Sequence, residues 1–152
     1  MGTKQEMLGH PFMVGLAPEH QAAMVECARE AFIQKGTWLL RNGDLADQFF
    51  LVQEGVLSIE LYVPNRAEHS IQTVHPGELL GWDWMVPPYR WTFDVRAQED
   101  CRAFAVDARC IRGKGQVDHE FGYQLQNRIS QVMARRVKAL RFQLLDVYSH
   151  EP

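Results

Sequence analysis

The segment Gly81–Ala97, GWDWMVPPYRWTFDVRA, brings five side chains with binding potential close together. Two of them are tryptophans, and the others are an acid, an arginine and a hydroxyl residue. A few polar groups among aromatic side chains are typical of a pocket that orients an apolar or aromatic ligand. Two tryptophans can also fill such a space themselves, since one aromatic side chain buries about 150–250 Å². The five residues are Trp82, Asp83, Arg90, Trp91 and Thr92.

Motifs of known catalytic or metal-binding chemistry do not occur in the sequence. There is no GxSxG, P-loop or GxGxxG motif, and the acidic and histidine residues are scattered without paired spacing. The three cysteines, Cys27, Cys101 and Cys110, contain no CxxC pair, so we expect neither a metal site nor a disulfide framework. We therefore predict a protein that is not an enzyme, needs no cofactor or metal, and is located in a reducing cytoplasm.

Regular turn signals predict the strands that must position these residues. Glycine or proline recurs about every ten residues between Gly36 and Gly77, a spacing typical of a β-sandwich or barrel. In the third segment below, Leu57, Ile59 and Leu61 alternate with polar residues, as in a half-buried strand. The predicted strands are Thr37–Arg41, Gln48–Gln53, Val56–Tyr62, His69–Val74, Arg90–Gln98 and Arg102–Val106.

Alternation within the fifth of these strands predicts which side chains point inward. Trp91 shares a face with Val95 and Ala97, which we take as the interior. Arg90 lies on the opposite face with Asp94, which we expect to be exposed to solvent. Arg90 reaches the interior only if a β-bulge after the two prolines shifts the register by one residue.

Helices are predicted on both sides of the β region, which spans residues 36–107. Pro18 can start the first helix, and apolar residues recur at spacings of three and four as far as Phe32. We therefore predict a helix over residues 18–34 that Gly36 ends. A second helix is predicted over about residues 117–148, which contain no proline. Its length of about 45 Å exceeds what packing within so small a domain requires.

An apolar seam runs along the last helix. Met133, Val137, Leu140, Leu144 and Val147 follow one another at alternating spacings of four and three, which is typical of a coiled coil of about two heptads. Packing of this helix on its own strands is the alternative. We predict a homodimer formed through Leu125, Ile129, Val132, Met133, Val137, Leu140, Leu144 and Val147.

Composition and charge fit one globular domain over residues 1–152. Hydrophobic residues make up 46% and charged residues 23% of the chain. The net charge of −3 gives no reason to expect nucleic acid or an anionic membrane as a partner. No apolar stretch reaches the roughly 18 residues of a membrane-spanning helix, and the N-terminus has no apolar run typical of a signal peptide.

The order of these segments resembles the cyclic-nucleotide-binding domain, in particular that of the catabolite activator (Crp/Fnr) family. The resemblance implies a mainly β fold with flanking helices (α+β), in which a jelly-roll-like double-stranded β-roll precedes a long dimerisation helix. It also implies a regulatory or sensor domain, here standing alone without a helix-turn-helix. The resemblance spans about residues 16–148 and rests on Gly43-Asp44, QFFLVQEGVLSIEL at 48–61, HPGELLG at 75–81, VRAQEDC at 95–101 and MARR at 133–136.

The same resemblance places the family's ligand contacts on changed residues. The family's glutamate for the ribose, its arginine for the phosphate and the small residue after that arginine fall on Trp82, Trp91 and Thr92. The family's two base-contacting hydroxyl residues fall on Leu140 and Arg141. A cyclic phosphate is a permanent anion whose burial needs a paired cation. We therefore expect that the domain does not bind a cyclic nucleotide in the family's manner.

Three uses of this altered site are left open. The two tryptophans fill it and the roll is a rigid platform, or the site takes an apolar or aromatic small molecule, or it takes cAMP or cGMP through a rearranged cassette. Any such ligand is expected to contact Leu80, Gly81, Trp82, Asp83, Arg90, Trp91, Thr92, Leu140 and Arg141. Basic residues of the last helix, Arg128 and Arg136 among them, are expected to form a solvated face, and no specific DNA binding is expected without a reading helix.

Overall fold

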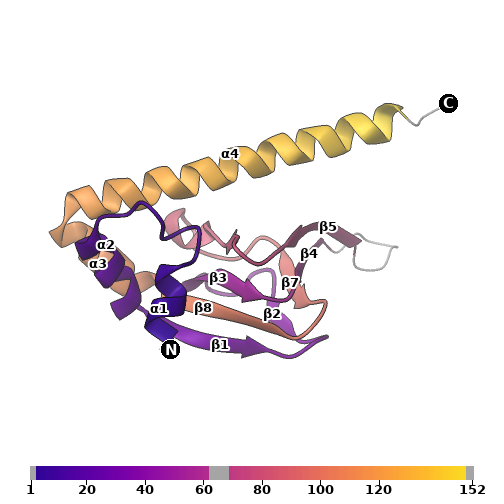
Figure 1. The fold of residues 1–152 in the computed structure, drawn as a ribbon. Helices are drawn as coiled ribbons and strands as arrows, with labels where there is room; N and C mark the ends of the chain where they lie inside the picture. The colour runs from indigo at the N-terminus through magenta and orange to yellow at the C-terminus, as the bar shows by residue number, and fades with distance from the viewer. Residues whose placement is uncertain (1–2, 62–68, 150–152) are drawn as a thin grey trace.

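The computed structural model describes residues 3–61 and 69–149, within which two antiparallel four-stranded sheets precede a long helix (Figure 1). The strands are β1 Ala28–Ile33, β2 Trp38–Leu40, β3 Gln48–Glu54, β4 Leu57–Leu61, β5 His69–Val74, β6 Leu79–Leu80, β7 Asp94–Ala97 and β8 Cys101–Asp107. The helices are α1 Thr3–Leu8, α2 Pro18–Glu26, the short 3₁₀ helix η1 Asp83–Met85, α3 Ala108–Val117 and α4 His119–Ser149.

The two sheets form the predicted jelly-roll-like β-roll. One sheet has the strand order β1-β8-β3-β6 and the other β2-β7-β4-β5. Consecutive residues such as Phe49 and Phe50 of β3 are both buried, because this sheet has side chains packed on both of its faces. The apolar core therefore continues from the space between the sheets to the helices α2, α3 and α4.

The prediction of one helix over residues 18–34 is wrong in its second half. The helix α2 ends at Glu26, and residues 28–33 form β1, which pairs with β8 from Ala28 opposite Val106 to Ile33 opposite Cys101. Phe32, assigned to the apolar helix face, is 74% exposed. Pairing with the distant strand β8 makes this segment a strand. The spacing of apolar residues within a short stretch of sequence cannot reveal such a pairing.

The other strand predictions are largely confirmed. His69–Val74 has the predicted bounds, and the strand predicted over residues 90–98 is shortened to β7, because the chain before it forms a loop. The strand predicted to end at Tyr62 ends at Leu61 in the described residues, and Tyr62 itself lies outside them. The strand β6 and the helices η1, α1 and α3 were not predicted.

The long C-terminal helix is confirmed, and Asp118 separates it from α3. The Asp118 carboxylate accepts a hydrogen bond from the Phe121 N–H at 3.2 Å, as an N-cap residue does. The C-terminal end of α4 rises away from the strands (Figure 1). Among the described residues, no helix has both the length and the apolar character needed to cross a bilayer.

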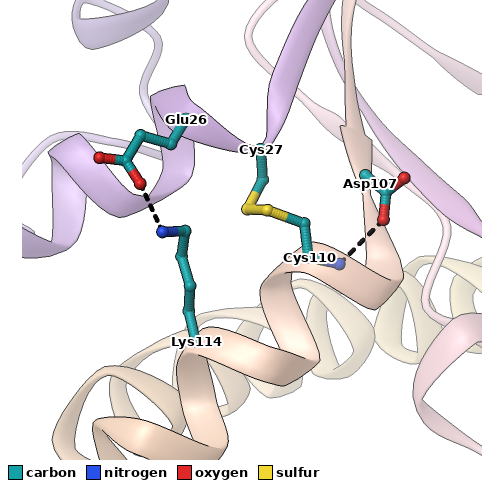
Figure 2. The surroundings of a disulfide bond; sticks show 5 residues. All are labelled: Glu26, Cys27, Asp107, Cys110 and Lys114. Atoms are coloured by element: carbon teal, nitrogen blue, oxygen red, sulfur yellow. Dashed lines mark hydrogen bonds and ion pairs between the residues drawn. A yellow bond between two sulfur atoms is a disulfide. The ribbon is translucent and has the colours of Figure 1, made fainter.

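The expectation that the cysteines form no disulfide is wrong. Cys27 and Cys110 are joined by a disulfide, with their Cα atoms 5.6 Å apart and with a separation of 83 positions in sequence (Figure 2). Cys101 is free and buried. The bonded cysteines are neighbours because the start of β1 lies beside α3, which local spacing of cysteines does not reveal.

Candidate functional site

The predicted binding segment folds between β6 and β7 as a turn, a 3₁₀ helix and a loop. We call residues 81–93 the cassette. It begins at Gly81, whose φ of +103° favours glycine, and it contains a cis peptide bond between Pro87 and Pro88. An isolated bridge between Leu45 and Arg90 holds its last part against the chain after β2.

Trp91 points into the roll, as predicted. Its side chain is 2% exposed, and its ring lies so close to Gly81 that a Cβ atom there would come within 2.8 Å of the ring carbon Cη2. The Trp91 N–H donates to the Asp44 carbonyl at 2.9 Å, and the Gly43 N–H donates to the Trp91 carbonyl at 2.8 Å. Trp91 and Gly81 therefore form one packed unit in which glycine leaves the room that the ring takes.

Arg90 points away from the interior, also as predicted. Its side chain is exposed, and its Nη1 donates to the Gly43 carbonyl at 3.1 Å. Thr92, on the other side of Trp91, is exposed as well. Neither the cation nor the hydroxyl group of this segment therefore reaches the interior of the roll.

The strand face that carries Arg90 and Asp94 was expected to be exposed to solvent, and this expectation is wrong for Asp94. The Asp94 side chain is buried, pairs with Arg41 at 3.4 Å and accepts a hydrogen bond from the Asn42 N–H at 2.7 Å. The Arg41 guanidinium carbon also lies 4.0 Å from the centroid of the Trp38 ring. Residues of β2 and the loop after it thus cover this outer face, which alternation within one strand cannot predict.

Arg136 of α4 lies over Trp82 of the cassette, and not on the solvated face that was expected for it. Its guanidinium carbon lies 5.3 Å from the centroid of the Trp82 ring, and its Nη2 donates to the Leu79 carbonyl. Burial lowers the pKa of Arg136, and the Glu78 carboxylate partly offsets this effect. A cation over the face of an indole is a favourable contact. Trp82 is therefore half-buried beneath a charged residue of α4.

The resemblance placed two residues of the last helix at the site. Leu140 and Arg141 are exposed on α4, beyond Arg136. Arg128 is half-buried and donates to the Phe12 carbonyl at 2.8 Å, so the basic face is solvated only in part. A signal for Arg136 was available, because it follows buried Val132 by four residues and thus shares its helix face.

Asp83 and Trp84 place two buried polar atoms in the cassette. Asp83 Oδ2 and Trp84 Nε1 have no hydrogen-bond partner within the part of the chain that the structure describes. The Trp84 ring stacks on Phe49 with 5.0 Å between centroids, and the Trp84 carbonyl accepts from Arg112 Nη1 at 2.7 Å. Leu80, just before the cassette, is fully buried. The cassette is thus tied to α3 through Arg112.

Burial raises the pKa of the Asp83 carboxyl above its ordinary 3.8. The folded state therefore binds this proton more tightly than the unfolded state, and the ionised carboxylate opposes folding as the pH rises above 3.8. We expect Asp83→Asn to raise the free energy of unfolding at pH 7 by less than about 1 kcal/mol, because the side chain is only half-buried and solvent screens its charge. The gain should disappear below pH 3.8, where both states hold the neutral acid. Urea titrations at pH 7 and pH 3 measure it, with exposed Asp44→Asn as the control that should change stability little.

The predicted dimer seam divides into two parts. Leu125, Ile129 and Val132 are buried in the core of their own roll, and Met133 packs against it. The remaining four residues are exposed, as Val137 at 46%, Leu140 at 38%, Leu144 at 55% and Val147 at 62%. The first half of the seam therefore follows the alternative of packing on the domain's own strands, and the second half is an uncovered apolar stripe.

The described residues, 3–61 and 69–149, contain no group of three or more His, Cys, Asp or Glu side chains arranged to hold a metal ion. The cassette therefore contains packed aromatic side chains, one of which, Trp82, lies beneath Arg136, and the half-buried acid Asp83. Such an arrangement can fill the interior of the roll or recognise a bound molecule.

A family model described as the cyclic nucleotide-binding domain matches residues 30–115, which is more than half of the chain. Comparison with curated protein sequences gives no significant match.

Solved structures share this fold at low sequence identity. A cyclic nucleotide-binding domain from Methylobacillus flagellatus KT has a TM-score of 0.82 at 16% identity, over 94% of this chain and 83% of that one. The sensor domain of the transcriptional regulator DNR from Pseudomonas aeruginosa has a TM-score of 0.69 at 15% identity, over 89% and 91%. The catabolite activator protein of Thermus thermophilus has a TM-score of 0.71 at 21% identity, over 91% and 63%. At such identities the likeness shows the fold alone, and it confirms the predicted β-roll with its C-terminal helix.

Proposed function

Because the chain belongs to the cyclic nucleotide-binding domain family, we propose that it is a non-catalytic regulatory domain whose altered cassette does not hold a cyclic nucleotide in the family's manner. The observation that carries this proposal is Trp91, which fills the interior beside Gly81 at the position where the resemblance places the phosphate-binding arginine.

The charges around the cassette disfavour a bound cyclic nucleotide. A buried cyclic phosphate needs a cation, and the nearest arginine in the cassette, Arg90, is exposed and bonded to the Gly43 carbonyl. Loss of the charge partner of a buried ion costs about 3–5 kcal/mol, which is a loss of affinity of roughly 100-fold or more. The other two arginines that contact the cassette also bond to carbonyls of their own domain. Arg136 donates to the Leu79 carbonyl and lies over Trp82, and Arg112 donates to the Trp84 carbonyl.

Thermal unfolding of the protein with cAMP and with cGMP tests the proposal. A nucleotide at 100 times its dissociation constant would raise the free energy of unfolding by about 2.7 kcal/mol. We expect no shift of the midpoint with either nucleotide at millimolar concentration. A saturable shift with either one contradicts the proposal, and its loss in Arg90→Gln would identify a re-aimed Arg90 as the phosphate partner.

An apolar or aromatic small molecule is the second candidate ligand. It is favoured by the unpaired Asp83 Oδ2 and by Trp82, which is only half-buried beneath Arg136. The same thermal assay with a panel of neutral aromatic compounds discriminates this sensor from a filled platform. A saturable shift that Trp82→Ala removes supports the sensor.

We further infer a homodimer formed through the exposed stripe of α4. Val137, Leu140, Leu144 and Val147 keep the alternating spacing of a two-helix seam, and this part of the helix rises away from the roll. A second copy of the stripe is the partner that matches it, because a coiled coil pairs like seams. The cytoplasmic location and the absence of specific DNA binding stay predictions. Arg128 and Arg136 support the latter, since each donates to a backbone carbonyl of its own domain.

Leu144→Glu is expected to convert the dimer to a monomer. An unpaired charge within an apolar interface costs several kcal/mol, so the dimer should dissociate about 100-fold more readily. Leu145→Glu is the matched control, because Leu145 is also exposed but lies outside the seam. Sedimentation velocity at tens of micromolar should show a dimer for the wild type and for Leu145→Glu. A monomeric wild type, or equal behaviour of the two variants, contradicts the inferred interface.

A further inference from the structure

The Cys27–Cys110 disulfide lies where α2, β1 and α3 meet (Figure 2). Cys27 directly follows α2, and Cys110 lies in the first turn of α3. Both cysteines line a surface hollow of about 860 Å³, together with Glu26, Arg109 and Lys114. The bond is therefore adjacent to a space that admits a reagent from solvent.

Access to the two cysteines differs. Cys27 is 7% exposed and belongs to the core, whereas Cys110 is only partly buried. Val117, which also lines the hollow, is 91% exposed, so the described chain leaves the hollow open there. An attacking thiolate that enters the hollow therefore meets Cys110 first.

We propose that this disulfide is a thiol–disulfide exchange site that takes a dithiol as its redox partner and controls the attachment of α2 to α3. The first thiolate of the dithiol attacks Cys110 Sγ, and the bond to Cys27 breaks with Cys27 leaving as the thiolate. The second thiol of the partner then attacks its own sulfur in the mixed disulfide, and Cys110 leaves as the thiolate. The protein gains two electrons and two thiols, and the partner is oxidised to its disulfide.

The surroundings of Cys110 favour its release as a thiolate from the mixed disulfide in the second step. Its backbone N–H lies in the first turn of α3, where a helix terminus stabilises a thiolate. Arg109 and Lys114 add positive charge around the same hollow. Asp107 opposes them, because its carboxylate accepts the Cys110 N–H at 2.9 Å.

After reduction, two polar contacts and the packing of core side chains still join α2 to the α3–α4 region. Glu26 pairs with Lys114, and His20 Nε2 lies 3.3 Å from Asp118 (Figure 2 shows the first pair). The Glu26 and Asp118 side chains are 66% and 48% exposed, and such pairs stabilise a contact weakly. The disulfide is thus the strongest single link at this junction.

Reduction of the folded protein by dithiothreitol tests the proposal. Thiols are counted by alkylation after acid quenching and denaturation. The count should rise from one, Cys101, to three. Direct exchange predicts a rate that rises in proportion to dithiothreitol concentration without denaturant, and re-formation of the bond with oxidised dithiothreitol. A rate independent of reductant concentration means that a conformational opening, and not direct attack on the folded protein, limits the reaction. This result would overturn the proposal, as would failure to re-form.

Lys114→Gln keeps both cysteines and removes one cation from the hollow. We expect it to slow reduction about two- to fivefold, whereas Lys138→Gln, the same change on the exposed part of α4, should leave the rate unchanged. Equal rates of reduction in the two variants would overturn the proposal that positive charge around the hollow promotes the exchange.

Hydrogen exchange of the oxidised and the reduced protein measures the conformational consequence. Amides of α2 and of the first turn of α3 should lose protection on reduction, while those of β3 and β8 should keep theirs. Equal protection of α2 in both states would overturn the control of its attachment. None of these outcomes depends on whether the cassette binds a nucleotide.

Discussion

Replacing Trp91 by alanine should lower the free energy of unfolding by about 3–5 kcal/mol, the range for truncating a large buried aromatic side chain. Trp91 is 2% exposed and packs directly on Gly81, so nothing nearby takes its space without moving the backbone. Urea unfolding followed by circular dichroism measures the loss. Trp82→Ala is the matched control, because Trp82 is only half-buried, and it should cost less than half as much.

The same variant tests whether the tryptophan fills the family's site. Removal of the ring should leave an apolar cavity beside Gly81, and such cavities bind small aromatic molecules. Indole at 100 times its dissociation constant should then restore about 2.7 kcal/mol to Trp91→Ala and leave the wild type unchanged. Equal losses for the two tryptophan variants, or stabilisation of the wild type by indole, would contradict a filled site.

The second large effect is expected at the disulfide. Cys27 and Cys110 close a loop of about 84 residues, and in the chain-entropy account a crosslink of this size contributes about 4.6 kcal/mol. For a chain of this length, the double variant Cys27→Ser/Cys110→Ser should unfold about 9–18 °C below the oxidised wild type. Differential scanning calorimetry measures the difference.

Cys101→Ser is the control for the loss of a cysteine as such. Cys101 is buried and free, and its Sγ lies 3.2 Å from the Glu99 carbonyl, a contact that a hydroxyl can keep. Reductant should lower the unfolding temperature of the wild type and of Cys101→Ser by similar amounts, and it should not change that of the double variant. A double variant as stable as the oxidised wild type would show that the crosslink contributes nothing.

Much of the β-roll could be predicted from the sequence because its strands alternate and its turns are punctuated by glycine. His69–Val74 has the predicted bounds, and Trp91 lies inside while Arg90 lies outside, as the period of two requires. Residues 28–33 also fit the spacing of a helix, and only their pairing with β8 makes them a strand. The burial of Asp94 was likewise not predictable from alternation, because residues of another strand and of the loop after it cover this side chain.

Some features of the candidate site also follow from the sequence, and others depend on the tertiary structure. The sequence determined which residues occupy the cassette, and therefore that tryptophans stand where the family's resemblance places a glutamate and an arginine. It did not determine that Arg136 reaches Trp82, because this contact depends on where α4 crosses the roll. A helix seam indicates which residues share a face, but not how many of them the domain's own core covers.

The sequence by itself thus determined the family fold, the inward tryptophan and the long final helix, since each follows from periodicity, punctuation and motif order along the chain. Tertiary structure alone decided the disulfide, the burial of Asp94 and the division of the α4 seam. Each of these joins segments that lie far apart in sequence. Their contact is set by strand order and by the packing of helices on the sheet, which no local pattern contains.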